Sequence, residues 1–154
     1  MLAGPDGDHG KPGLRTAADR LDGFIAGLAE HGVSVDSDRI VWTAFTRDGG
    51  YEGMERLLRA GIDGIDLVFA VNDVMAVGAM SALRDAGLEP GVDVAVAGFD
   101  DIPTLRDVTP RLTTASLPLE RVGEEALALA LADGDATPAP ITAEVAIRES
   151  TPRR

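Results

Sequence analysis

Residues 65–73 read IDLVFAVND, and residues 92–101 read VDVAVAGFDD. Each stretch is a run of apolar, partly β-branched residues that stops abruptly at polar side chains, as strands of a covered sheet do. In an open parallel sheet, ligands bind in the crevice at the carboxyl ends of the strands, so polar groups there face a ligand rather than the core. The two stretches together predict a small-molecule receptor built on an α/β sheet.

The rest of the chain alternates between helix-like and strand-like patterns. Leu21, Phe24, Ile25 and Leu28 recur at helical spacing and predict a helix over about residues 16–30. Similar patterns predict helices between residues 50 and 61 and over 73–86 and 119–132, and extended segments over 39–45, 66–71, 92–99, 112–117 and 141–148. Strands that alternate with helices of this length form a parallel sheet joined by right-handed crossovers. The predicted fold class is therefore α/β, a three-layer lobe with a parallel sheet.

The composition is that of one acidic globular domain. The chain has 154 residues, of which 45% are hydrophobic and 26% are charged, enough to bury a core. Its net charge of −12 repels a phosphate backbone, so we expect no direct binding of duplex DNA by these residues. The chain contains no cysteine, which fits a reducing compartment. We expect a cytoplasmic location, because the first residues do not resemble a signal peptide and no apolar run is long enough for a membrane helix.

The residue types that most enzymes and metal sites need are scarce. The two histidines are His9, in a glycine-rich segment, and His31, at a predicted helix end. A histidine–carboxylate metal site or a Ser–His–Asp triad therefore has no suitable histidine around which to assemble. Residues 4–13 are glycine-rich but lack the spacing of a phosphate-binding loop. Asp100 and Asp101 are adjacent on an extended segment and point to opposite sides, so a shared cation is not expected. We expect no enzymatic activity, no cofactor and no metal.

Residues 69–118 read FAVNDVMAVGAMSALRDAGLEPGVDVAVAGFDDIPTLRDVTPRLTTASLP. This stretch resembles the effector-binding domain of LacI/GalR-type transcriptional regulators, which has a periplasmic-binding-protein-like fold of two similar lobes. By this resemblance, residues 1–118 form the C-terminal lobe. Residues 119–140 form a helix and linker that belong to the otherwise missing N-terminal lobe, and residues 141–154 form a return strand and tail. The resemblance therefore implies an incomplete, truncated fold that lacks the DNA-binding helices and the first helix of the C-terminal lobe.

The same resemblance assigns four ligand-binding residues. Arg20 lies in DRLDGF, which matches the family's Arg-x-x-Gly-Phe, and its guanidinium offers a fixed fork of donors. Asp100 can accept hydrogen bonds from neighbouring sugar hydroxyls, and Asn72 offers both a donor and an acceptor. Phe45 corresponds to an aromatic residue that stacks on the ligand ring in relatives, although core packing explains it equally well. Asp73 is expected to cap the helix that follows it.

The resemblance implies a sensor of a small effector, a sugar or a nucleoside-like molecule. The effector would bridge the two lobes and shift their relative orientation, which changes operator affinity. DNA would be bound only through the absent N-terminal domain. A homodimer is expected through the helix over residues 73–86, whose small residues would admit a partner closely, and through residues 102–112. Two alternatives stay open, namely a fragment of a periplasmic-type sugar-binding protein and an interaction fragment without a ligand.

Overall fold

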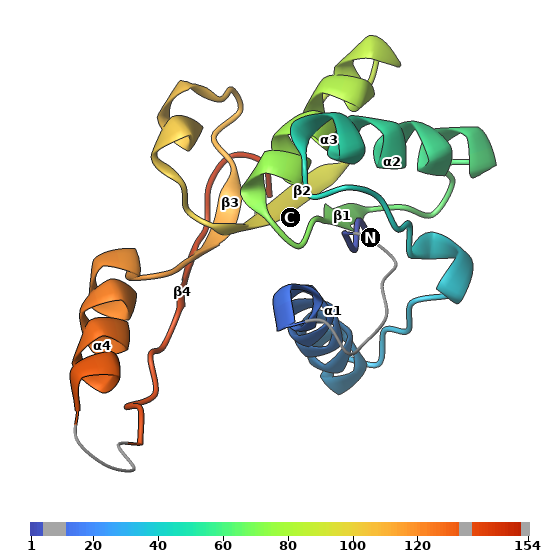
Figure 1. Ribbon diagram of the computed structural model, residues 1–154. Helices are drawn as coiled ribbons and strands as arrows, with labels where there is room; N and C mark the ends of the chain where they lie inside the picture. Colours follow the sequence, from blue (N-terminus) through green and yellow to red (C-terminus); the bar gives the residue numbers. More distant parts are fainter. Residues whose placement is uncertain (5–11, 133–136, 152–154) are drawn as a thin grey trace.

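The computed structural model describes residues 1–4, 12–132 and 137–151 of the chain (Figure 1). Within these residues, a four-stranded sheet has the order β1-β2-β3-β4, with β1–β3 parallel and β4 antiparallel to β3. The strands are β1 (Leu67–Phe69), β2 (Ala95–Asp100), β3 (Thr113–Ser116) and β4 (Glu144–Ala146). The helices are α1 (Pro12–Glu30), α2 (Arg47–Ala60), α3 (Asp73–Asp85) and α4 (Leu119–Leu131), with short 3-10 turns η1 (Ser37–Arg39) and η2 (Pro103–Asp107). The α/β fold class predicted from the sequence is confirmed.

The first four residues extend the sheet beyond β1. The amide of Leu2 donates to the carbonyl of Phe69, and the amide of Val71 donates back to Leu2. On the other side, the amide of Ala3 donates to the carbonyl of Val41. Leu2 is fully buried between these neighbours. The strand predicted over residues 39–45 is therefore shorter than expected, because only an isolated parallel bridge between Leu2 and Val41 forms there.

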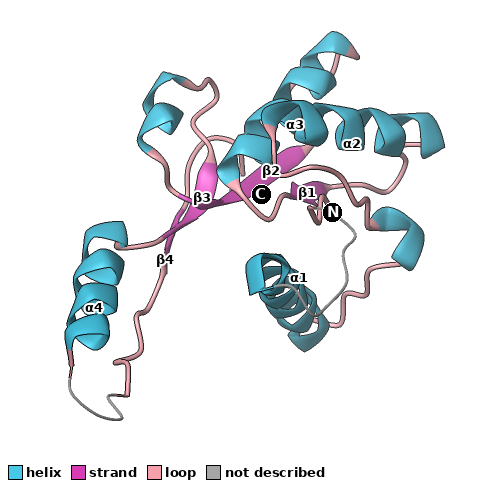
Figure 2. Ribbon diagram, in the orientation of Figure 1, coloured by secondary structure: helices cyan, strands magenta, loops and turns pink. Residues whose placement is uncertain are grey.

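Helices cover both faces of the sheet, as Figure 2 shows, with α2 and α3 on one face and α1 on the other. On the α1 face, the ring of Phe24 stacks on Phe69 at 4.3 Å between centroids. On the opposite face, the largest buried side chains come from α2, α3 and the strands: Met54, Leu57, Met75, Met80, Leu83, Val68 and Val96. This three-layer arrangement places the carboxyl ends of the strands at one edge, beside the start of α3.

The contact between α2 and α3 depends on glycine. A Cβ built on Gly78 of α3 would lie 1.9 Å from the carbonyl oxygen of Arg47, and one on Gly50 of α2 would lie 2.1 Å from that of Met75. No side chain fits at either position, because backbone packs directly on backbone. Ala76 and Ala79 of α3 are also fully buried. Gly78, which was expected together with Ala76 and Ala79 to admit a second copy, allows instead the close approach of α2 within the chain.

The helix α4 lies apart from the rest of the described structure (orange in Figure 1). It buries none of its residues, and among its apolar side chains Leu127 is 61% exposed and Leu131 is 75% exposed. A soluble helix normally buries such a face against a neighbour. The predicted linker that follows, residues 133–140, lies partly outside the described residues. Among the described residues, no helix is both long enough and apolar enough to cross a membrane.

The exposure of α4 predicts weak protection of its amides. Leaving a Leu-sized side chain in water forfeits roughly 1.5–3 kcal/mol, so α4 lacks most of the stabilisation that tertiary packing gives a helix. We expect residues 119–131 to exchange amide hydrogens much faster than residues 67–71 and α3 at protein concentrations where the chain is monomeric. Hydrogen exchange read by mass spectrometry measures this difference. Equally strong protection of both regions in the monomer would contradict it.

Candidate ligand site at the carboxyl ends of the strands

Arg20 and Asp100 form an ion pair at the end of β2. One guanidinium nitrogen of Arg20, Nη2, donates to Asp100 Oδ1 at 2.7 Å, and Nη1 donates to the carbonyl of Val71 at 2.8 Å. The guanidinium also lies over the ring of Phe99, 4.2 Å from its centroid. Both charged side chains are about four-fifths buried, so water screens the pair only partly. The helix α1 and the sheet thus fix two of the four predicted ligand residues together.

The backbone at Asp100 and Asp101 has an uncommon conformation. Asp100 has a φ of 114° and Asp101 a φ of 57°, both in the region that favours glycine. Holding an aspartate in such a conformation costs of order 1–3 kcal/mol and is typical of ligand and switch sites. The turn directs the two carboxylates to different arginines, Arg20 and Arg148. This geometry agrees with the expectation that the two do not share a cation.

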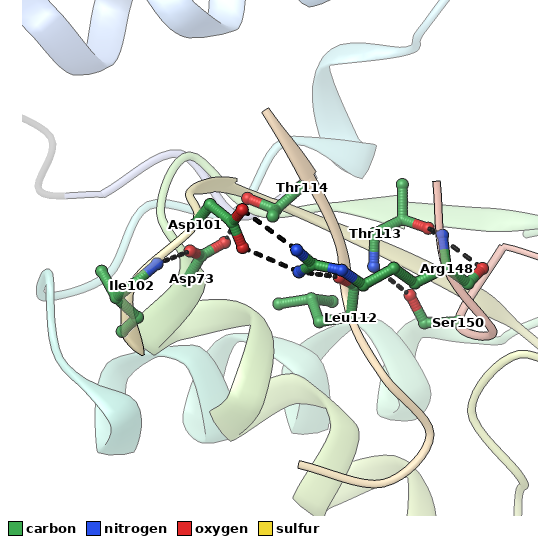
Figure 3. A network of polar contacts seen from close by, with 8 residues as sticks. All are labelled: Asp73, Asp101, Ile102, Leu112, Thr113, Thr114, Arg148 and Ser150. Atoms are coloured by element: carbon green, nitrogen blue, oxygen red, sulfur yellow. Dashed lines mark hydrogen bonds and ion pairs between the residues drawn. The ribbon is translucent and has the colours of Figure 1, made fainter. Parts of the chain in front are cut away.

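Asp101 is the centre of a second polar cluster, shown in Figure 3. Arg148, two residues after β4, contacts Asp101 through both guanidinium nitrogens, at 2.7 Å and 3.0 Å, and also donates to the carbonyl of Leu112. Its own amide donates to Thr113 Oγ1. The hydrogen bond from Arg148 holds the pKa of Asp101 below its usual value, against the opposing effect of partial burial. The pair therefore fastens the segment after β4 to the end of β2.

Asp73 is buried beneath this cluster and does not cap α3. Its carboxylate accepts hydrogen bonds from Thr114 Oγ1 at 2.6 Å and from the amide of Ile102 at 3.0 Å. Burial raises the pKa of Asp73, while these two hydrogen bonds act in the opposite direction. A Cβ on Gly98 would lie 2.3 Å from Asp73 Oδ1, so the space around this carboxylate is filled. The predicted capping role was wrong because Asp73 lies inside the first turn and faces the sheet.

Asn72 is the residue that caps α3. Its side-chain oxygen accepts a hydrogen bond from the amide of Met75 at 2.8 Å, the usual N-cap geometry. The cap uses the acceptor of the amide, and within the described part of the chain its Nδ2 has no hydrogen-bond partner. Asn72 follows Val71, whose carbonyl receives Arg20. Asn72, a predicted ligand residue, thus has a structural role through its side-chain oxygen, and its Nδ2 donor is not used by that role.

Phe45 lies at the same edge but contacts neither Arg20 nor Asp100 through a hydrogen bond or ring stack. Its ring lies against Gly4, where an added Cβ would be 2.3 Å from Cε1, and the residue is 36% exposed. Phe45 is therefore not buried in the core, which was the alternative explanation for this residue. A hollow of about 350 Å³ under α1 is lined by Arg20 and mainly by apolar residues of the sheet, and Phe45, Asn72 and Asp100 are not among its lining residues.

The sequence reasoning missed Arg148 and Thr114. Arg148 is far from Asp101 in the chain, and only the antiparallel pairing of β4 with β3 brings it near. The available signal for Arg148 was Asp101, a second carboxylate directly after Asp100. A partly buried aspartate requires a charged or hydrogen-bonding partner. Thr114, one of two consecutive threonines, carried no signal of its own.

Comparison with known proteins identifies the family of this chain. A family profile described as a periplasmic binding protein-like domain matches residues 1–151. The chain belongs to this family. Its relatives are regulators of the LacI/GalR type, as the resemblance predicted: it is 37% identical over 127 residues to the HTH-type transcriptional regulator GalR of Escherichia coli, covering 82% of this chain and 37% of that protein. These relatives are named as transcriptional regulators and repressors, not as enzymes, which agrees with the expectation of no enzymatic activity.

Solved structures of the family have the same fold. A sugar-binding transcriptional regulator of the LacI family from Escherichia coli superposes with a TM-score of 0.78 at 31% identity, over 97% of this chain and 54% of that one. A LacI family regulator from Enterococcus faecium with bound ribose superposes with a TM-score of 0.77 at 25% identity, over 97% of this chain and 55% of that one. The chain spans about a third of the length of the curated relatives that it matches.

The Asp101–Arg148 pair predicts a pH-dependent contribution to stability. Because the pKa of Asp101 is lowered on folding, its stabilisation is present above the unfolded-state value of about 3.9 and is lost as pH falls through the folded-state value. We expect Asp101→Asn, which tolerates the same φ, to lower the free energy of unfolding by about 1–3 kcal/mol at neutral pH. The difference from the unmodified chain should shrink in acid. Urea unfolding followed by Trp42 fluorescence measures both.

The matched control is Asp63→Asn, which removes the same charge at an exposed position. It should change stability little at any pH. A loss for Asp101→Asn that is equal at neutral and acidic pH would show that the ion pair is not its cause.

Proposed function

We propose that this chain is the ligand-sensing lobe of a LacI-type regulator that responds to a sugar, with Arg20, Phe45, Asn72 and Asp100 as the ligand-binding residues. The observation that carries the proposal is the Arg20–Asp100 pair, which is fixed at the strand ends beside a strained backbone. Backbone strain of this kind is typical of ligand and switch sites. The relatives described as sugar-binding and ribose-bound support the choice of ligand class.

The side chains at this edge suit a polyhydroxylated ligand. Asp100 keeps lone pairs beyond those used by Arg20, and Asn72 keeps its amide donor, so together they accept from and donate to hydroxyl groups. The exposed ring of Phe45 offers an apolar surface on which the carbon face of a sugar can pack. A nucleoside-like ligand, whose ribose carries the same hydroxyls, is the alternative within this chemistry.

The proposal includes a second lobe. We assign residues 1–118 to one lobe, residues 119–140 to a helix and linker of the other lobe, and residues 141–154 to the return strand and tail. The unpartnered apolar face of α4 supports this division, since a companion sheet would cover it. A ligand bound between the lobes would act by its differential affinity for two lobe orientations, and DNA would be contacted outside these residues. A periplasmic-type sugar-binding fragment would use the same site and differ only in what accompanies it.

We predict that this chain binds a sugar with low affinity and in a saturable manner. Saturation-transfer NMR against a panel of monosaccharides, disaccharides and nucleosides tests it, because contacts from only one lobe give low affinity. Asp100→Asn should weaken any hit about tenfold, since a charged hydrogen-bond acceptor is lost. Asp63→Asn serves as the charge-matched control and should leave binding unchanged. Binding by no member of the panel, or equal loss in both variants, would favour the ligand-free interaction fragment.

We also propose a homodimer through the exposed edge of α3 and the residues from Ile102 to Leu112. Val74 of α3 remains 39% exposed although much of the helix is buried, and an apolar side chain there favours a partner. Since the small residues of α3 face α2, the dimer contact would be made by side chains rather than by close backbone approach.

Light scattering at micromolar concentrations should therefore report a dimer. Val74→Glu should shift it toward the monomer by placing a charge in the interface, because an unpaired buried charge is costly. Val92→Glu is the control, since Val92 is 64% exposed and precedes β2. If the unmodified chain is a monomer, the dimer proposal is wrong, whereas the proposal for the ligand site is unaffected.

A further inference from the structure

A second hollow lies on the Asp101 side of the strand ends. Its volume is about 200 Å³, and three arginines line it, Arg106 of η2, Arg111 before β3 and Arg148 after β4. Asp101 and apolar residues between 102 and 105 complete the lining. Asp100 and Arg20 are not among these residues, so the hollow is separate from the proposed sugar site.

The charges around this hollow do not balance. Arg148 is paired with Asp101 through two contacts, and the charge of Arg111 also acts on Asp101, so three guanidinium groups share the single carboxylate of the lining. Within the described residues, the side chains of Arg106 and Arg111 make no hydrogen bond or ion pair. An excess of positive charge in one hollow is unexpected in a chain whose net charge is −12.

We propose that this hollow binds a phosphate group, either as inorganic phosphate or as a small phosphate monoester. A guanidinium presents its donors in a fork that matches the oxygens of phosphate, and arginine is accordingly over-represented where proteins recognise phosphate. Leu105 is buried and Ile102 half-buried, so part of the lining is apolar.

Of the three arginines that line the hollow, Arg148 is the one whose side chain is already held in place. Its guanidinium is held by Asp101 and the carbonyl of Leu112, so it does not need to be ordered when the anion arrives. Arg106 and Arg111 supply the free donors and the positive charge. Asp101 is the single carboxylate of the lining, and its charge is already directed to Arg148. An anion in the hollow therefore meets three guanidinium groups and one carboxylate.

The test is an NMR titration of the ¹⁵N-labelled 154-residue chain in phosphate-free buffer. It is done at a concentration where light scattering reports a monomer throughout, because the proposed dimer contact includes residues 102–112. Inorganic phosphate and glycerol 3-phosphate are the two probes, and glycerol and sodium chloride at matched ionic strength are the controls. We expect saturable shifts of amides in residues 102–112 and 148–151, with little change in residues 67–71. A response to both probes supports a phosphate-group site, and a stronger response to one identifies the free or the esterified form.

Two variants decide the role of the arginines. Arg106→Gln with Arg111→Gln should weaken the response about tenfold or more, because charge-assisted hydrogen bonds are lost. Arg56→Gln with Arg121→Gln removes the same charge from α2 and α4 and should leave it unchanged. Shifts that do not saturate, shifts equal to those with sodium chloride, or equal loss in both double variants would overturn the proposal. Since the probes carry no sugar ring and the variants leave Arg20 and Asp100 unchanged, this outcome is distinguishable from that of the sugar test.

Discussion

The pairing of two adjacent aspartates with two distant arginines organises the end of the sheet. Asp100 holds α1 through Arg20, and Asp101 holds the segment after β4 through Arg148. Each connection joins parts of the chain that are far apart in sequence. Both depend on positive φ angles at consecutive residues, which turn the carboxylates in different directions. The backbone strain there is offset by two partly buried ion pairs, so the local conformation and the long-range contacts stabilise each other.

Asp73 lies under this turn and connects it to the core. Its carboxylate receives the amide of Ile102, directly after the two aspartates, and the hydroxyl of Thr114 in β3. Since Asp73 begins α3, the helix that packs closely on α2 is tied to the strand ends by the same group. The surroundings of these three aspartates decide what each one does. Asp100 and Asp101 each pair with an arginine, whereas Asp73 accepts from neutral donors in a buried space.

Much of the fold could be predicted from the sequence because its strong patterns are local. The strand around Val68 and the helix from Asp73 follow from apolar runs and helical spacing. The position of Arg20 near the strand ends was implied by the family's Arg-x-x-Gly-Phe motif, but its ion pair with Asp100 was not predicted. What could not be predicted depends on contacts between distant segments. The choice of Asn72 rather than Asp73 as the cap is decided by Thr114 and the amide of Ile102, and the short pairing at Val41 is decided by the first four residues. The small residues of α3 predict close packing, but their pattern does not identify the partner, which is α2.

The position of Arg20 on α1 gives the helix a mechanical connection to the site. Arg20 and Phe24, one turn apart, join the 19-residue helix to the strand end and to the face of the sheet. A ligand hydroxyl that accepted from Nη2 of Arg20 would compete directly with the contact to Asp100 that anchors α1. Ligand binding at the proposed site would then also loosen the attachment of α1, because a single arginine belongs to both.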